Sequence, residues 1–254
     1  MELEQRIRNA LARKDILLMT HIVLGYPSLA VNREVIGQMV ANGVDLIEMQ
    51  IPFSEPIADG PVILKANQEA IGREIKVREC LEFATEMIAT HAIPFLFMTY
   101  YNIIFRFGPK AFINKAAELG IRGLIVPDLP PEEGEDYLRL ARDHGIAPIL
   151  ILAPTSTTER MQYLGKLGAG FIYCVARKGV TGRHTRFDQD ITAYLARCRH
   201  ATSLPLAVGF GLRTREDVEF LIGKADIAVI GSETIRLVDR EGPAAVGPFI
   251  AGLK

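Results

Sequence analysis

The sequence has no tryptophan and only three cysteines, Cys80, Cys174 and Cys198, which are odd in number and far apart. None belongs to a CxxC pair or a Cys/His cluster. This argues against a disulfide framework or a metal site, and we expect three small core residues. A strong charge bias is also missing, because 29 basic and 30 acidic residues leave a net charge of −1. This balance gives no sign of a nucleic-acid partner.

Long hydrophobic runs are absent too. No apolar stretch approaches the roughly 20 residues that cross a bilayer, so the sequence predicts no membrane association. The first fifteen residues, MELEQRIRNALARKD, are charged and amphipathic, unlike a secretory signal peptide. We therefore expect a cytoplasmic protein, in which an extra amino-terminal helix over residues 1–11 covers one end of the fold.

Glycine is plentiful, and several glycines separate an amphipathic helical pattern from a short apolar run. A glycine just after a helix often adopts the left-handed conformation that ends it, as expected at Gly43, Gly120, Gly145, Gly168 and Gly223. Short runs rich in Ile, Val and Leu are typical of buried parallel strands. Eight occur: ILLMTHIVL, VDLIEMQI, IPFLFMTY, IRGLIV, IAPILILA, AGFIYCVA, LPLAVGF and ADIAVI.

The alternation of strands and helices predicts parallel strands joined by right-handed crossovers. Eight strands in 254 residues favour a single (β/α)8 TIM-barrel domain over residues 1–254, rather than a doubly wound sheet. Residues 156–159 and 214–217 have capping-box spacing and predict two helix starts. In such barrels the chemistry lies at the carboxyl ends of the strands.

Two carboxylates stand near the end of the second strand. Glu48 interrupts an apolar run, so it either faces the barrel mouth or lies buried against a polar partner. We favour the first alternative, in which Glu48 is a general acid or base. Asp59 ends the proline-rich turn PFSEPIADGP. It is either a turn residue that bonds its own backbone or a second carboxylate facing Glu48.

Glycine-rich loops follow the later strands. Gly209-Phe210-Gly211 follows the seventh strand and Gly231-Ser232 the eighth, where many barrels bind phosphate through backbone N–H groups and a helix amino terminus. A third such loop, residues 178–182, follows the sixth strand. The alternative is that these glycines only permit tight turns. His21, in the first strand, either lines the pocket or is a hydrogen-bonded core residue, and Tyr100 and Tyr101 are expected to form an aromatic rim.

Taken together, these segments resemble the alpha subunit of tryptophan synthase over essentially the whole chain. The matching stretches are PFSEPIADGPVI at 52–63, MTYYN at 98–102, VPDLPPEE at 126–133, GVTG at 179–182, GFGL at 209–212 and IGSE at 230–233. The resemblance implies retro-aldol cleavage of indole-3-glycerol phosphate to indole and glyceraldehyde 3-phosphate, without a metal or organic cofactor. It also implies a partner, the PLP-dependent beta subunit, in an α2β2 complex contacted through residues 52–61 and 127–133.

The resemblance further implies roles for individual residues. Glu48 matches the residue that passes protons between the glycerol hydroxyl and indole C3, and Asp59 matches the one that holds the indole N–H. The phosphate would bind the backbone around Gly182, Gly211, Gly231 and Ser232. The positions that match the indole pocket and its closing loop are Tyr173, Phe210, Ile125, Ile151 and Thr181.

Three positions depart from the family pattern. Gln50 stands where the family usually has glycine, and because i and i+2 share a face of a strand, it would crowd the substrate or bond Glu48. Glu55 replaces an aspartate, and Thr20-His21 replaces an apolar pocket wall with a polar one. Three alternatives remain open: an ordinary alpha subunit, a weakly active one that mainly activates its beta partner, and a stand-alone indole-releasing lyase.

Overall fold

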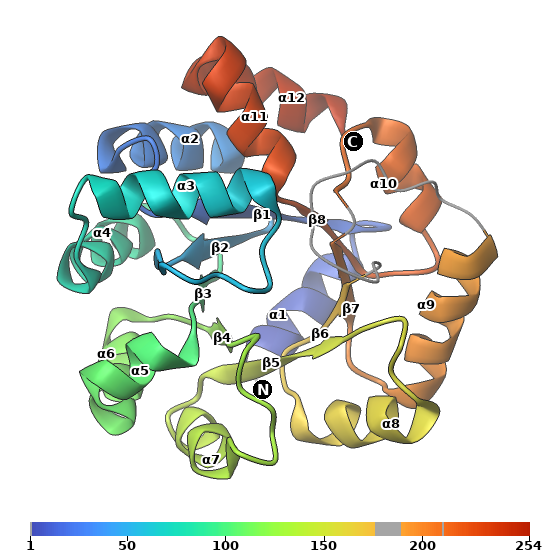
Figure 1. The fold of residues 1–254 in the computed structure, drawn as a ribbon. Helices are drawn as coiled ribbons and strands as arrows, with labels where there is room; N and C mark the ends of the chain where they lie inside the picture. Colours follow the sequence, from blue (N-terminus) through green and yellow to red (C-terminus); the bar gives the residue numbers. More distant parts are fainter. Residues whose placement is uncertain (1, 176–188, 210) are drawn as a thin grey trace.

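The strands form a closed barrel. The computed structural model describes residues 2–175, 189–209 and 211–254. Each strand pairs in parallel with its neighbours in the order β1 to β8, and β8 pairs with β1 (Figure 1). The strands are β1 Leu17–Val23, β2 Leu46–Gln50, β3 Phe95–Met98, β4 Gly123–Ile125, β5 Ala147–Leu152, β6 Ile172–Val175, β7 Leu206–Gly209 and β8 Ile227–Ile230. All eight lie within the predicted apolar runs, which confirms the TIM-barrel fold.

Helices surround the barrel (Figure 1). They are α1 Glu2–Leu11, α2 Leu29–Ala41, α3 Pro61–Gly72, α4 Val77–Thr90, α5 Tyr101–Phe107, α6 Pro109–Leu119, α7 Glu135–Asp143, α8 Thr158–Leu167, α9 Gln189–Ala201, α10 Arg215–Leu221, α11 Ser232–Glu241, the 3-10 helix η1 Pro243–Ala245 and α12 Val246–Gly252. Within the described ranges, no helix has the length and apolar character that a membrane crossing requires.

Most of the predicted helix boundaries hold, with two corrections. Four of the five glycines have positive φ, but Gly168 is extended, and it is a close approach that favours glycine there: an added Cβ would lie 3.0 Å from Ile172. The capping box of Thr214 and Asp217 is present. At α8, however, the cap is Thr157 and not Ser156, because the Ser156 hydroxyl already accepts a hydrogen bond from the Ala153 N–H.

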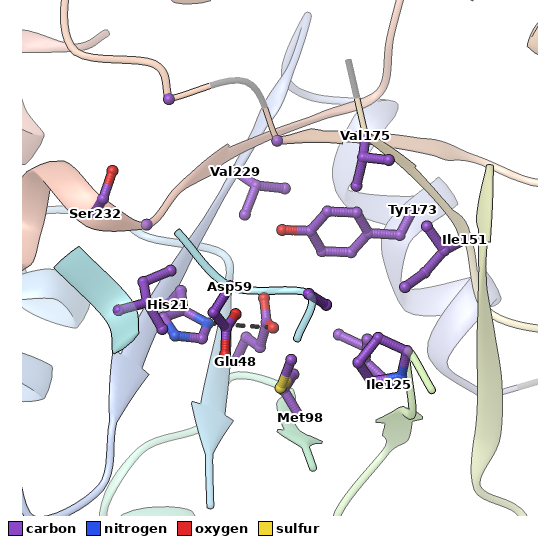
Figure 2. A pocket seen from close by; sticks show the side chains of 16 residues that line it. His21, Glu48, Asp59, Met98, Ile125, Ile151, Tyr173, Val175, Val229 and Ser232 are labelled. Carbon is purple, nitrogen blue, oxygen red and sulfur yellow. Dashed lines mark ion pairs between the residues drawn. The ribbon is translucent and has the colours of Figure 1, made fainter. Parts of the chain in front are cut away.

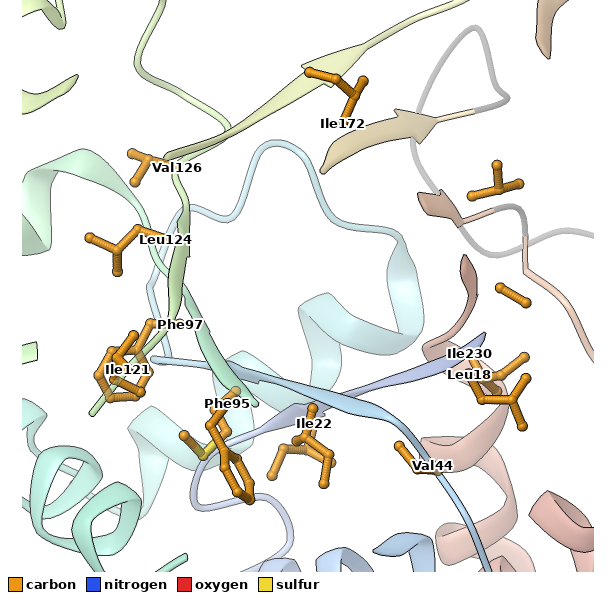
Figure 3. Packing of buried hydrophobic residues seen from close by; sticks show 14 of the residues in the cluster. Leu18, Ile22, Val44, Phe95, Phe97, Ile121, Leu124, Val126, Ile172 and Ile230 are labelled. Carbon is orange, nitrogen blue, oxygen red and sulfur yellow. The ribbon is translucent and has the colours of Figure 1, made fainter. Parts of the chain in front are cut away.

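Side chains alternate between the two faces of the barrel wall. Those that point outward pack against the helices, as Figure 3 shows for Leu18, Ile22, Phe97 and Leu124. Those that point inward form a second cluster, to which β1 contributes Leu17 and Met19, β2 Leu46, and β3 Leu96 and Met98. This period of two is the ordinary geometry of a β-strand, and it determines which residues can reach the interior.

Helix α1 fills the amino-terminal end of the barrel, as the sequence predicts. Its buried residues Leu3 and Ile7 join the interior cluster. Leu3 lies so close to Gly123, the first residue of β4, and to Gly170, just before β6, that an added Cβ at either glycine would crowd it. Because the apolar face of α1 fills this end, the described residues leave the interior open to a ligand at the carboxyl ends of the strands.

Candidate active site

A cavity lies at the carboxyl ends of the strands (Figure 2). The inward-facing series of several strands continues into it: His21 follows Met19 by two residues, Glu48 follows Leu46, and Met98 follows Leu96. The residues that line the cavity are His21, Glu48, Ala58, Asp59, Ile63, Met98, Ile125, Pro127, Ile151, Tyr173, Val175, Gly209, Gly211, Val229, Gly231 and Ser232.

Glu48 forms a buried ion pair with His21. The two residues are register partners on β2 and β1, so their side chains lie next to each other on the inner face. Glu48 Oε1 lies 3.2 Å from His21 Nδ1, and about 95% of each side chain is buried. Burial acts most strongly on the pKa of His21 and lowers it. The attraction of Glu48, its hydrogen bond and the charge of Asp59 outweigh this, so the net shift is upward.

Asp59 is held by two donors on one oxygen. Gln50 Nε2 donates to Asp59 Oδ2 at 2.6 Å, and the Tyr100 hydroxyl donates to the same oxygen at 3.1 Å. Asp59 is thus a second carboxylate beside Glu48, with side-chain partners that a simple turn residue would not need. Burial raises the pKa of Asp59, although the Gln50 bond, the charge of His21 and the Tyr100 bond each oppose the shift. The two carboxylates therefore sit in different environments.

Tyr100 has a role that sequence reasoning missed. It was expected to be part of an aromatic rim, but its side chain is almost fully buried, stacks on Phe53 and bonds Asp59. The Ala58 N–H donates to the same hydroxyl at 3.1 Å, which fixes the turn beside Asp59. The position of Tyr100 in the sequence could have indicated this inward direction. Tyr100 follows inward-facing Met98 by two residues, and Met98 is the register partner of Gln50.

The opposite rim of the cavity is built from backbone. Helix α11 begins at Ser232, immediately after Gly231, so its amino-terminal N–H groups and positive dipole end lie at the cavity. The Ser232 hydroxyl accepts a hydrogen bond from Arg236 Nη1 at 3.3 Å. Gly211 has a φ of +73°, a conformation that favours glycine. Among the described residues that line the cavity, the carboxylates are Glu48 and Asp59 on β2 and the turn after it, so an anion at this rim would meet N–H donors.

Apolar side chains form a slot between the carboxylates and β5–β6. The predicted pocket residues Ile125, Ile151 and Tyr173 all line it (Figure 2). Tyr173 depends on the glycine at 209, because an added Cβ there would lie 2.8 Å from its hydroxyl. Met98, Val175 and Val229 also line the cavity and were not singled out from the sequence. A flat, mostly apolar ligand fits such walls.

Comparison with known proteins decides the family. The family model for the tryptophan synthase alpha chain matches residues 7–246. A tryptophan synthase alpha chain from Desulfotalea psychrophila is 64% identical over 254 residues, which is 100% of both chains. The chain belongs to the tryptophan synthase alpha chain family. It is therefore a lyase that functions in tryptophan biosynthesis.

Solved structures of tryptophan synthase agree with this family assignment. The enzyme from Mycobacterium tuberculosis is similar with a TM-score of 0.92 and 29% identity, covering 99% of this chain and 96% of that one. A tryptophan synthase complex from Pyrococcus furiosus is similar with a TM-score of 0.86 and 28% identity, covering 93% of this chain and 97% of that one.

The residues that the sequence analysis singled out as departures from the family pattern lie in different places. Gln50 is fully buried beside the cavity, and the hydrogen bond it makes is to Asp59 and not to Glu48. Of the Thr20-His21 pair, only His21 reaches the cavity. Thr20 faces the other way, with its hydroxyl 3.2 Å from Met39 Sδ. Glu55 is exposed in the turn before Asp59.

Some predicted residues lie outside the described ranges, namely Gly182 and Thr181 in the loop after β6, and Phe210 after β7. Their assignments stay predictions. Among the described residues, no group of three or more His, Cys, Asp or Glu side chains could hold a metal ion. The three cysteines are buried and free, as expected for core residues.

Proposed function

We propose that this cavity cleaves indole-3-glycerol phosphate to indole and glyceraldehyde 3-phosphate, with Glu48 and Asp59 as its catalytic residues. One carboxyl group, that of Glu48, delivers a proton to indole C3 and takes the proton of the hydroxyl on the adjoining carbon. The bond between these two carbons breaks, its electrons restore the aromatic ring, and the hydroxyl carbon becomes the aldehyde. The net change is the movement of one proton from oxygen to carbon, which is general acid–base catalysis.

The observation that carries this proposal is the pairing of two carboxylates at one side of a cavity with a helix amino terminus at the other. Glu48 Oε1 is held by His21, whereas Oε2 is buried with no partner in the described part of the chain and is available to exchange a proton. A buried polar atom of this kind is costly and marks a place for a ligand.

Asp59 suits a different task. Its Oδ2 accepts both hydrogen bonds, which leaves Oδ1 to accept the indole N–H and to stabilise the positive charge that forms on the protonated ring. Separate environments allow one carboxyl group to gain and lose a proton while the other stays ionised. Ile125, Ile151 and Tyr173 would enclose the indole ring between them.

For the phosphate we propose the rim formed by Gly211, Gly231 and Ser232, together with Gly182. Support comes from the N-terminus of α11 and from the Arg236 hydrogen bond, which orients the Ser232 hydroxyl. Phe210 and Thr181 are proposed to complete the indole pocket and its closing loop. Loop closure over the substrate would exclude water.

We also propose that the chain works with a PLP-dependent beta subunit in an α2β2 complex, through residues 52–61 and 127–133. The similar Pyrococcus furiosus structure is a tryptophan synthase complex. In this chain Ile57, within the first segment, is 72% exposed, although large apolar side chains are usually covered. Asp128 in the second segment accepts hydrogen bonds from the Tyr101 N–H at 2.9 and 3.1 Å, which ties that loop to α5.

Turnover of indole-3-glycerol phosphate by the purified chain, with and without a beta subunit, tests both proposals. We expect indole release that Glu48→Gln and Asp59→Asn each lower by about a hundredfold or more, the range of a general acid–base group. Indole release that survives both substitutions would contradict the catalytic assignment. A chain that releases no indole but stimulates the reaction of the beta subunit would indicate an activator. Full indole release without any binding to a beta subunit would indicate a stand-alone lyase.

A further inference from the structure

Two polar side chains, His21 and Gln50, each contact one of the proposed catalytic carboxylates. His21 Nδ1 contacts Glu48 Oε1 at 3.2 Å, and Gln50 Nε2 donates to Asp59 Oδ2 at 2.6 Å. Both side chains are nearly or fully buried. Each carboxylate is therefore held through one oxygen by a neighbour that is itself shielded from water.

The bridge has a complementary pair of atoms at its centre. His21 Nε2 and Gln50 Oε1 are both buried, and neither has a hydrogen-bond partner among the described residues. One is a ring nitrogen that donates when the imidazole is charged, and the other is an amide oxygen that accepts. Their residues lie on the inner face of adjacent strands, where His21 pairs in register with Glu48, two residues before Gln50. Leaving both atoms unpaired is costly, so joining them is favourable.

We propose that His21 and Gln50 form a polar bridge that joins Glu48 to Asp59 and positions both carboxylates for the reaction. This inference rests on the proposed function of the two carboxylates and adds two positioning residues to it. The bridge runs Glu48, His21, Gln50, Asp59. Through this bridge, the orientation of the Glu48 carboxyl group, which transfers the proton, depends on the orientation of the Asp59 carboxylate, which holds the indole nitrogen.

The charges around His21 agree with this arrangement. Burial lowers the pKa of His21, but Glu48 on β2, Asp59 in the following turn and the nearby Gln50 side chain each raise it, and the net shift is upward. On the side of β8, His21 packs near Gly231, which carries no side chain. Across the cavity, burial raises the pKa of the Tyr173 phenol and keeps it neutral. A charged imidazole has both ring N–H groups available, which the bridge requires.

The test is the pH profile of kcat/KM for indole-3-glycerol phosphate in Gln50→Met, His21→Asn and the double variant. Gln50→Met removes the hydrogen bond to Asp59, which lowers the pKa of that carboxyl group, and the interaction with His21, which raises the pKa of the imidazole. In the pH profile of this variant, the acid limb should move to higher pH and the base limb to lower pH. The pH range of high kcat/KM therefore becomes narrower at both ends. We expect kcat/KM at the optimum to fall by about tenfold to a hundredfold, as for a lost hydrogen bond to a charged group.

His21→Asn separates a bridge from a simple support for Glu48. The asparagine amide can take the place of Nδ1 beside Glu48, but it cannot reach Gln50 and does not titrate. We expect it to lose the base limb and to lower kcat/KM about tenfold, with the double variant no worse than the poorer single variant. Losses that multiply in the double variant, or full activity in His21→Asn, would overturn the bridge.

Thr20→Val is the matched control, because Thr20 is buried on the same strand but faces the helices. It should leave the pH profile unchanged. Thermal unfolding and affinity for the hydroxyl-free analogue 3-(indol-3-yl)propyl phosphate show that each variant is folded and still binds. Glu48→Gln in the same assay separates the two proposals. If it stays active, the proposed function fails. If it is inactive while the bridge variants match the unsubstituted protein, only the bridge fails.

Discussion

His21 and Glu48 are register partners on adjacent strands, and their side chains meet at 3.2 Å in the barrel interior. Parallel pairing places both side chains on the same face, and the closed barrel puts that face in a space with little water. A charge in such a place requires a partner of opposite sign. The pair therefore explains how Glu48 can remain in an otherwise apolar strand and still lie beside a cavity.

Asp59→Asn should make the protein more stable at neutral pH while it abolishes activity. The pKa of Asp59 is raised in the folded state, so folding favours its protonated form. Its ionisation therefore costs stability, and the cost appears as the pH rises above the unfolded value near 3.8 and is complete above the folded pKa. Melting temperatures of both proteins should converge at pH 3.5 and diverge toward pH 7. An equal gap at both pH values would contradict this linkage.

Tyr100→Phe should lower kcat/KM by about tenfold without unfolding the chain. The substitution removes the hydroxyl that donates to Asp59 but keeps the ring stacked on Phe53. Because this bond lowers the pKa of Asp59, the acid limb of the pH profile should also move to higher pH. Tyr101→Phe, one residue further on, is the control and should behave like the unsubstituted protein.

Gly209→Ala should weaken indole binding by about tenfold, because an added Cβ would lie 2.8 Å from the Tyr173 hydroxyl and push the ring into the slot. Equilibrium binding of indole measures this effect directly. Gly37→Ala is the matched control: Gly37 lies in α2 with nothing within 4 Å of the new Cβ, so helix propensity should raise stability by about 0.5–1 kcal/mol. Unchanged indole affinity in Gly209→Ala would show that Tyr173 does not shape the pocket.

Ser232→Asp should raise KM for indole-3-glycerol phosphate at least tenfold and change kcat far less. The new carboxylate stands at the first residue of α11, where it stabilises the helix dipole but repels a phosphate. Ser232→Ala removes only the hydroxyl and should raise KM by roughly fivefold at most. Similar KM values for both variants and the unsubstituted protein would place the phosphate elsewhere.

The sequence alone was sufficient for the barrel. Short apolar runs, five of them behind a glycine that was expected to end a helix, predicted the eight strands, since burial on both faces and the helix C-terminus each leave a local signature. The same local patterns placed Glu48 and the glycine-rich segments after β7 and β8 at the carboxyl ends of the strands. Local patterns were less reliable for features that depend on contacts with other segments, such as helix caps. Ser156 was displaced as a cap by a turn hydrogen bond, and Gly168 is needed for close packing and not for its backbone angle.

Tertiary structure decided what the side chains of the site contact. The sequence placed Gln50 on the face of Glu48, but the closed barrel brings Asp59 to it from the following turn, and Tyr100, just after β3, donates to the same carboxylate. It also turned Thr20 toward the helices and left His21 alone to meet Glu48. Local sequence sets the period of a strand and hence the direction of each side chain. Which distant residue lies opposite depends on strand register and barrel closure, and these form only when the whole chain packs.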